Sequence, residues 1–365
     1  MRYQVDWYSP DLVRIGTLQA FNTLSIVRTE NEVGALVMTL PSHGFDTNSF
    51  KVGQYLEVWR ETHGVSRLFG ETAYFVQGWE FYSKGGQHLV AVYAKDLNFL
   101  LSTRIVYAAS GSTNAELTDY ADDMMKVIVT NELGSGAAST RRVEGLTVQA
   151  EVGQSVEITR GFAYGNVLGV VQDISGSATE QGTYTVFDMV RTGVGAFEFR
   201  TYVGQRGADH RRGSGDPRFV GEVYGNLEDP RLGFYHGEEW NFVYCGGQGE
   251  GESRVIKTAS DAARIGQGYP YNRKEYWRDA RHQETDDGVQ SDAYAALAEG
   301  KPKVVMTGKL LDTPGMQFGR DYDFGDVVSV EAFNTAIDCH VASVAINYAA
   351  EGGETIDISL RGELE

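Results

Sequence analysis

The sequence predicts a mainly β protein with α+β insertions, in which two antiparallel β-barrel domains arise by duplication. The first observation is a repeated pattern of a Gly, a β-branched strand and two strands joined by a Gly-Gly turn, at 52–93 and at 324–362. Gly53 and Gly325 open the two copies, and the leading Gly and the Gly-Gly turn recur at offsets of 272 and 267 residues. Offsets this similar favour one internal duplication. The second observation is the presence of 44 Gly and 7 Pro, which indicates many tight turns and hence many strands.

Composition limits the classes of function. A chain of 365 residues exceeds the size of one hydrophobic core, so we expect two to four domains. The net charge of −18 opposes stable binding of nucleic acid but suits a surface along which DNA slides. Cys245 and Cys339, the only cysteines, form no metal or disulfide pattern and suggest a reducing compartment. We expect neither a signal peptide nor a membrane-spanning segment, because no sufficiently long apolar run is present.

The first expected domain is an antiparallel barrel at 1–108. Residues 24–40 read as a strand, a polar turn and a second strand. A strand at 52–59 and a hairpin at 76–93 follow, and apolar and polar residues alternate along the hairpin. This alternation is typical of a sheet with one face exposed to water.

An α+β domain is expected at 109–205. A helix cap at 111–114 precedes an amphipathic helix from Ala115 to Leu133, and a second helix is expected from Ala163 to Gly176. Two strands complete this domain, at 183–191 and 196–204.

The second barrel is expected to comprise 206–252 and 320–365, with 253–319 as an insertion that contains short helices. Residues 232–248 repeat the strand, acidic turn and strand of 24–40, which predicts the first hairpin of this barrel. Within the insertion we expect an Ala-rich helix at Ser291–Glu299 and an amphipathic segment at 272–281.

Few residues suggest chemistry. The Gly-rich loop at 204–217 has two interpretations: a nest for an anion built from Arg206, Arg211 and Arg212, or a solvated loop whose arginines pair with Asp209 and Asp216. We favour the ion-paired loop.

Four acidic or Gly-rich segments are better explained as turns or strands. The segment GGQGEG at 246–251 lies between strands and lacks the helix behind it that a phosphate loop needs. The run at Asp321–Asp326 lacks the Gly and Glu of a calcium loop. The doublets at 238–239 and 286–287 point to opposite faces if they lie on strands, so they cannot flank one bond. We therefore expect no catalytic residues, no cofactor-binding residues, no metal ligands and no cofactor.

Five motifs in order carry a family resemblance. They are GAFEFRTYVGQRGADHR, NLEDPRL, NFVYCGGQGEGESR, NRKEYWRDAR and YDFGDVVSV. In this order they resemble the ReqiPepy-type siphophage tail proteins, which are in turn similar to the tail-tip or baseplate hub proteins of long-tailed phages.

The resemblance implies a structural, non-enzymatic subunit with two tail-tube-like β-barrels. Hub proteins of this kind are homotrimers whose six barrels form a pseudo-sixfold ring, which adapts a hexameric tail tube to threefold tip components. The implied partners are tail tube and distal tail proteins, the tape measure protein and tail-tip fibre or spike proteins. DNA would pass transiently through the lumen, and the protein would be assembled in the host cytoplasm and reside in the virion, at the tail tip.

Two alternatives stay open at this point. A hub subunit of a related contractile injection system would share this architecture. A glycan-binding or cell-wall-degrading tail protein is suggested by 5 Trp, 20 Tyr and many carboxylates.

Overall fold

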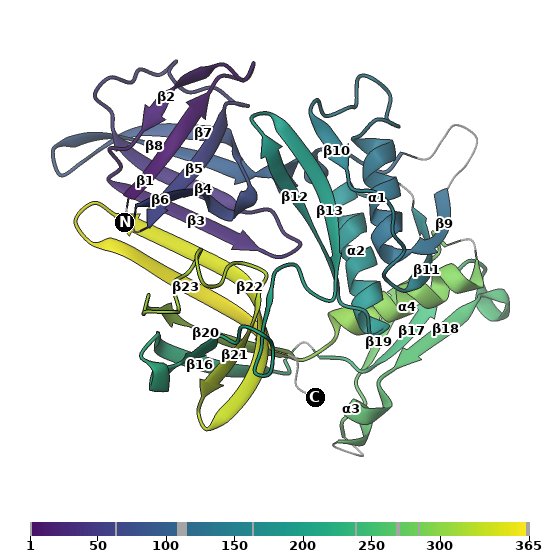
Figure 1. Ribbon diagram of the computed structural model, residues 1–365. Coiled ribbons are helices and arrows are strands. Elements are labelled where there is room, and N and C mark those ends of the chain that lie inside the picture. The colour runs from purple at the N-terminus through teal and green to yellow at the C-terminus, as the bar shows by residue number, and fades with distance from the viewer. Residues whose placement is uncertain are drawn as a thin grey trace.

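β strands dominate the protein, and helices lie to one side of the largest sheet (Figure 1). The computed structural model describes residues 2–62, 64–107, 115–162, 164–237, 239–267, 271–283 and 285–362. In these ranges most strands belong to one large sheet, and three small sheets account for the others. The mainly β prediction is therefore confirmed.

The N-terminal β unit, residues 2–96, is an antiparallel array that contains both expected hairpins, 24–40 and 76–93. Its strands are β1 (Arg2–Tyr8), β2 (Arg14–Leu18), β3 (Thr23–Thr29), β4 (Ala35–Pro41), β5 (Tyr55–Thr62), β6 (Val65–Leu68), β7 (Tyr74–Lys84) and β8 (Gln87–Asp96). The short 3₁₀ helices η1 (Phe69–Glu71) and η2 (Leu97–Thr103) precede β7 and follow β8. Gly85 and Gly86 both have positive φ, of 59° and 79°, as a tight two-residue hairpin turn requires.

The C-terminal β unit is assembled from segments on both sides of an insertion. Its strands are β14 (Asp209–His210), β15 (Phe219–Gly221), β16 (Leu227–Tyr235), β20 (Lys303–Leu310), β21 (Val327–Ala332), β22 (Thr335–Ala349) and β23 (Gly353–Gly362). The 3₁₀ helix η3 (Glu222–Tyr224) precedes β16. As the repeat predicts, β21 is followed by the β22–β23 hairpin.

The two β units share one strand order. In the N-terminal unit the neighbours run β3-β4-β8-β7-β5, and in the C-terminal unit they run β16-β20-β23-β22-β21. Tyr55 lies opposite Phe75, as Val327 lies opposite His340, which gives β5 and β21 the offset of 272 read from the sequence. The register also shifts at matching places, after Val76 in β7 and after Val341 in β22.

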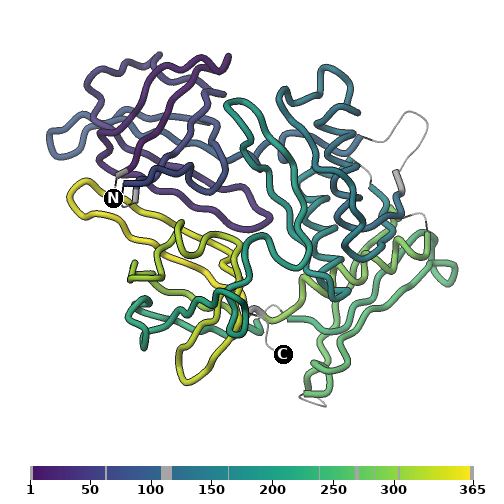
Figure 2. The backbone as a smooth tube through the Cα atoms, viewed as in Figure 1, coloured from purple at the N-terminus to yellow at the C-terminus, as the bar shows by residue number. Residues whose placement is uncertain are grey.

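The units are joined edge to edge. The second half of β22 pairs with β3, and in Figure 2 the yellow C-terminal hairpin lies beside purple N-terminal strands. The main path of the large sheet therefore runs without a break from β16 to β2. This path does not close on itself, so the described residues form no closed barrel.

The expected hairpin at 232–248 is wrong. β16 pairs with β20, whereas β17 (Phe242–Gly246) belongs to a separate sheet with β18 (Ile256–Ser260) and β19 (Glu275–Asp279). The chain leaves the C-terminal unit after β16, at the position of the β3–β4 turn, and returns with β20. The two strands next to each other in the sequence therefore have different partners, which a short apolar pattern does not specify.

The inserted part is a small αβ layer. Besides its strands it contains η4 (Gly251–Ser253), α3 (Ala262–Gly266) and α4 (Asp286–Glu299). The expected helix at 291–299 is the second half of α4, which begins after Thr285, whose side chain accepts a hydrogen bond from the Gly288 N–H. The amphipathic segment at 272–281 contains β19 at its centre.

The middle part packs two helices against small sheets. Its elements are β9 (Ala115–Tyr120), α1 (Ala121–Glu132), β10 (Leu146–Val148), β11 (Glu157–Phe162), α2 (Val167–Glu180), β12 (Thr185–Gly193) and β13 (Ala196–Val203). Both expected strands, at 183–191 and 196–204, are present with small shifts.

The predicted start of the first middle helix, at Ala115, is wrong. The first six residues form β9, which pairs with β11, and Thr118 and Thr159 hydrogen-bond across this pair at 2.8 Å. A distant partner strand therefore overrides the helical pattern, and the expected cap at 111–114 lies outside the described residues. The second helix, expected from Ala163, begins at Val167, after the Asn166 side chain that caps it.

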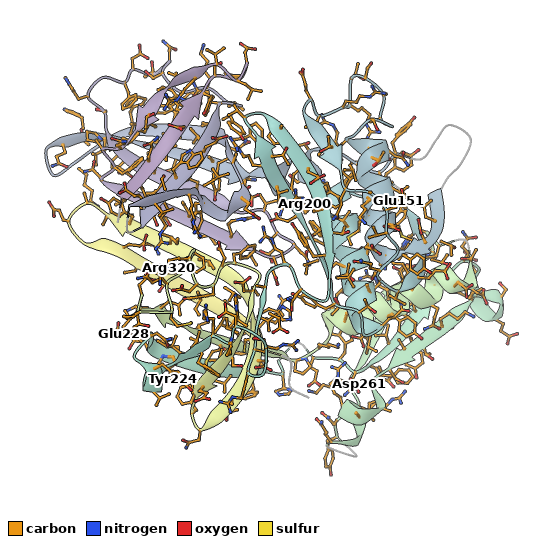
Figure 3. All side chains as sticks on the ribbon, in the orientation of Figure 1. Glu151, Arg200, Tyr224, Glu228, Asp261 and Arg320 are labelled. Carbon is orange, nitrogen blue, oxygen red and sulfur yellow. The ribbon has the colours of Figure 1, made fainter. Side chains whose placement is uncertain are left out.

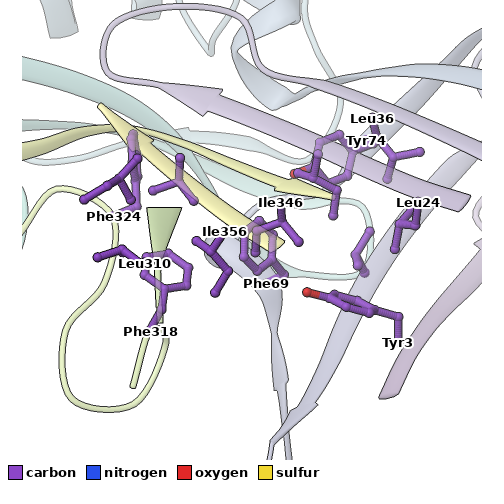
Figure 4. Close-up of a cluster of buried hydrophobic side chains, with 14 of the residues drawn as sticks. Tyr3, Leu24, Leu36, Phe69, Tyr74, Leu310, Phe318, Phe324, Ile346 and Ile356 are labelled. Carbon is purple, nitrogen blue, oxygen red and sulfur yellow. The ribbon is translucent and has the colours of Figure 1, made fainter. Parts of the chain in front are cut away.

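One hydrophobic core spans both β units. Leu24 and Leu36 from the N-terminal unit lie in the same cluster as Ile346 and Ile356 from the C-terminal unit (Figure 4). Ile26 and Ile346 are opposite each other in the β3–β22 pair, and both are fully buried. The two units therefore fold against each other and not around separate cores.

We predict that Ile346→Ala lowers the free energy of unfolding by about 2–5 kcal/mol, because it leaves a cavity in a close-packed core. Denaturant titration followed by circular dichroism measures this change. Val27→Ala, on the same strand pair but 39% exposed, is the matched control and should cost less than about 1 kcal/mol. Equal losses in the two variants would contradict a shared core at the junction.

Candidate assembly site at the junction of the units

The junction between the two β units is a strand pair with polar contacts on its outer face. β22 residues 343–349 run antiparallel to β3. The Ser25 hydroxyl donates to Asn347 Oδ1 at 2.7 Å, and the Thr29 and Ser343 hydroxyls are 2.9 Å apart. The Ser343 hydroxyl also donates to the Arg28 carbonyl oxygen at 3.0 Å. Backbone and side chains therefore fix one register.

A buried charge cluster lies beneath this strand pair. Arg28 donates through Nη2 to both carboxylate oxygens of Asp188, at 3.0 and 2.9 Å, and its Nε is 3.8 Å from Asp96 Oδ2. Arg206 donates to the same Asp188 at 2.8 Å. Both guanidinium groups lie over the Phe324 ring, 4.8 and 5.0 Å from its centroid. The cluster thus links β3, β8 and β12 to the segment that leads into β21.

The two carboxylates of the cluster titrate differently. Burial alone would raise the pKa of Asp188, but the charges of Arg28 and Arg206 outweigh it and hold this pKa below the usual range. Burial raises the pKa of Asp96 to about 7, since Arg28 offsets the loss of water only in part and Asp188 repels a second negative charge. Asp188 is therefore the ionised partner of both arginines.

A second ion pair joins the units at the far end of the β22–β23 hairpin. Arg60 of β5 donates two hydrogen bonds to the Glu354 carboxylate, of 2.6 and 3.0 Å, and one to the Phe318 carbonyl oxygen, of 2.7 Å. The Tyr3 hydroxyl also donates to Glu354. A bidentate arginine–carboxylate pair is directional, so it orients the hairpin as well as stabilising it.

The sequence patterns did not predict these junction residues. Arg28 and Asp188 are 160 residues apart, and no local pattern connects them. One signal was available: Arg28 continues the inward alternation of Leu24 and Ile26, so a strand at 24–29 places its charge in the core.

The Gly-rich loop at 204–217 contains arginines that are paired within the protein. Arg211 contacts Asp209 at 2.8 Å, Arg212 pairs with Glu331, and Arg206 belongs to the buried cluster. The pairing of Arg211 with Asp209 agrees with the ion-paired interpretation, whereas Asp216 pairs with Arg218 and Arg206 is buried and not solvated.

The other acidic and Gly-rich segments singled out in the sequence contribute to turns, ion pairs and a helix start. Asp326 accepts hydrogen bonds from the backbone N–H groups of Ala208 and Asp323, and Asp321 pairs with Arg320. GGQGEG runs from the end of β17 into the three-residue η4. Glu239 pairs with Lys274, and Asp286 and Asp287 lie in the first turn of α4. Glu238 lies outside the described residues.

Within the described ranges, no three His, Cys, Asp or Glu side chains are grouped as a metal site would need. Cys245 and Cys339 are buried, and burial raises the pKa of each thiol to about 12. None of the helices described is long and apolar enough to cross a membrane.

Three solved structures that share this fold are tail proteins. The tail protein from Neisseria meningitidis MC58 has a TM-score of 0.59 at 12% identity, covering 99% of this chain and 97% of that one. The 43 kDa tail protein of prophage MuSo2 from Shewanella oneidensis has the same TM-score at 11% identity, with coverages of 99% and 97%. The prophage tail protein gp18 from Listeria monocytogenes has a TM-score of 0.54 at 9% identity, with coverages of 98% and 94%. The fold is thus one that phage tail proteins use.

The family model described as siphovirus ReqiPepy6 Gp37-like protein matches residues 5–360. The chain therefore belongs to this family of phage tail proteins, and the resemblance expected from the five motifs is confirmed. Among curated proteins, none matches the chain.

We predict that Asp188→Asn lowers the free energy of unfolding by about 3–5 kcal/mol, because it leaves two buried arginine charges without their shared carboxylate. Asp209→Asn removes an exposed ion pair and should cost less than about 1 kcal/mol. Both values come from urea denaturation at pH 7. If Asp188→Asn lowers the free energy of unfolding no more than Asp209→Asn does, the buried charge cluster does not contribute to stability as predicted.

We predict a pH effect at Asp96. An unfolded Asp releases its proton near pH 4, whereas folded Asp96 holds it to about pH 7, so between these values the folded state binds more protons. Its stabilising contribution is therefore lost as the pH rises through 7. Asp96→Asn should make the fall in unfolding free energy between pH 5 and 8 smaller than in the unmodified protein. Asp11→Asn, at an exposed position, should keep the original slope, and an unchanged slope in Asp96→Asn would refute the assignment.

Proposed function

We propose that this protein is a structural, non-enzymatic hub subunit at the tip of a siphophage tail. Three copies form a ring in which six β units alternate around a central channel. The single observation that supports this is the shared strand order of the two β units, β3-β4-β8-β7-β5 and β16-β20-β23-β22-β21. Two similar units per chain convert threefold into pseudo-sixfold symmetry, which lets one ring meet a hexameric tube on one side and threefold components on the other.

The proposed ring assigns a role to each part of the chain. The N-terminal and C-terminal β units act as the two tube-like barrel domains of the proposal, each completed by its neighbours in the ring. The middle part and the inserted part, held together by α2 and α4, lie outside the sheet. They are the surfaces available to distal tail or fibre proteins, while the ring contacts the tail tube and the tape measure protein.

The acidic composition supports a channel that DNA crosses without binding. A net charge of −18 repels the phosphate backbone, whereas retention of DNA requires clustered cationic contacts. Ejection needs passage and not affinity.

We predict a trimer for the purified full-length chain. Light scattering after size-exclusion chromatography should give three times the chain mass of 40.2 kDa, and negative-stain images should show a ring with a central hole. A concentration series distinguishes a true trimer from self-association without a limit. A stable dimer, or trimers without a hole, would contradict the proposed ring.

A further inference from the structure

β7 and β16 each present an open edge of the large sheet among the described strands. β7 pairs with β5 only at Tyr74 and Phe75, and beyond its register shift at Val76 it pairs only with β8 among the described strands. β16 likewise pairs only with β20. Unpaired strand edges present rows of backbone donors and acceptors that another strand can pair with.

The open edges of β7 and β16 correspond to the two strands that pair at the internal junction, β22 and β3. By the shared strand order, β7 corresponds to β22 and β16 corresponds to β3. The register shifts place Gly78 at the position of Ser343, and the β4–β8 and β20–β23 pairings place Leu232 at that of Ile26. The open half of β7, residues 78–84, is therefore the counterpart of the half of β22 that pairs with β3.

We infer that the open half of β7 in one copy pairs antiparallel with β16 of the next copy, in the register of the internal junction. Carrying over that register sets Trp79 opposite Phe234, Phe81 opposite Leu232, and Tyr82 opposite Arg231. The inference rests on the ring proposed above and names the contact that closes it.

Burial supports this pairing on the core side of the sheet. At the internal junction Ile26 and Ile346 are fully buried and Val344 is 1% exposed. Their counterparts on the open edges, Leu232, Phe81 and Trp79, are large and apolar but only partly buried at the margin of the same core. Phe234, which stands at the position of Arg28, is 51% exposed. Two cross-strand apolar pairs would extend this core across the contact between copies.

The outer face and the strand ends are also compatible. The Tyr82 hydroxyl faces the Arg231 guanidinium, at the position where Asn347 and Ser25 hydrogen-bond within the chain. Lys84, at the tip of β7, comes opposite the β16 bulge, where the exposed Asp229 carries the opposite charge. Glu228 at the start of β16 lies on the side of the C-terminal unit away from the middle and inserted parts (Figure 3).

The two open edges of one copy do not pair with each other, because β16 and β7 are seven strands apart in a sheet order that does not close on itself. Because the edges are unlike, the contact is head-to-tail, and such contacts make a closed ring only if the rotation closes.

A double-cysteine variant tests the register. Tyr82→Cys combined with Arg231→Cys places two thiols directly opposite each other between copies, within the Cα separation of about 4.4–6.8 Å that a disulfide needs. Under mild oxidation of the full-length chain, denaturing gels should show covalent dimers and trimers and no larger species. Both native cysteines are buried, so the unmodified chain is a suitable blank.

A shifted pair is the matched control. Tyr82→Cys with Phe234→Cys moves one thiol three residues along β16, about 10 Å out of register, and should give at most one tenth of the covalent trimer. Equal cross-linking of both pairs would overturn the register. Absent cross-links in a protein that light scattering finds trimeric would overturn this contact but leave the ring. Absent cross-links in a monomer would overturn both.

A surface variant provides an independent readout. Phe234→Asp puts a charge where the contact needs an apolar side chain, and should raise the concentration at which half the chains are trimeric by at least tenfold. Val223→Asp, at a position 76% exposed and outside β16, should leave that concentration unchanged. Thermal unfolding of both variants checks that each one folds. Unchanged assembly in Phe234→Asp would contradict the contact.

Discussion

The pairing of β22 with β3 is the constraint on which the other parts depend. It joins strands more than 300 residues apart and turns two β units into one sheet with one core. The hydrophobic face supplies most of the favourable free energy, because Ile26, Ile346 and their neighbours are removed from water there. The backbone ladder and the hydroxyl contacts of Ser25 and Thr29 select the register. A slip of one residue would turn the apolar face outward.

Buried ion pairs fix which parts of the chain meet around the β22–β3 pair. Arg28, Asp188 and Arg206 bring together β3, the middle part and the approach to β21, and Arg60 holds the far hairpin through Glu354. Taking such groups out of water costs free energy that their attraction only partly returns, so their net contribution to stability is small while the loss of one partner is costly. Their effect is to specify which faces meet. In the proposed ring, such specificity would hold the open edges of the two β units at a fixed angle.

The fold is compatible with the ring proposed above. Within the chain, the β22 edge of one unit is satisfied by the β3 edge of the other. The same two kinds of edge recur at β7 and β16, where the described chain supplies no partner. In the proposed ring, this one kind of contact would be used once inside each chain and once between chains. The inserted part does not interfere, because it leaves the sheet at a turn and packs through α4 on α2.

The sequence by itself determined the mainly β class, the repeat with its offset of 272, the hairpins at 24–40 and 76–93, and the family. These features depend on local patterns: alternation, Gly turns and ordered motifs. Tertiary structure decided the partners. It paired β16 with β20 across the insertion, turned residues 115–120 into a strand against β11, and placed Arg28 beside Asp188. Strand pairing and buried charge depend on which distant surfaces meet, and a local pattern carries no information about that.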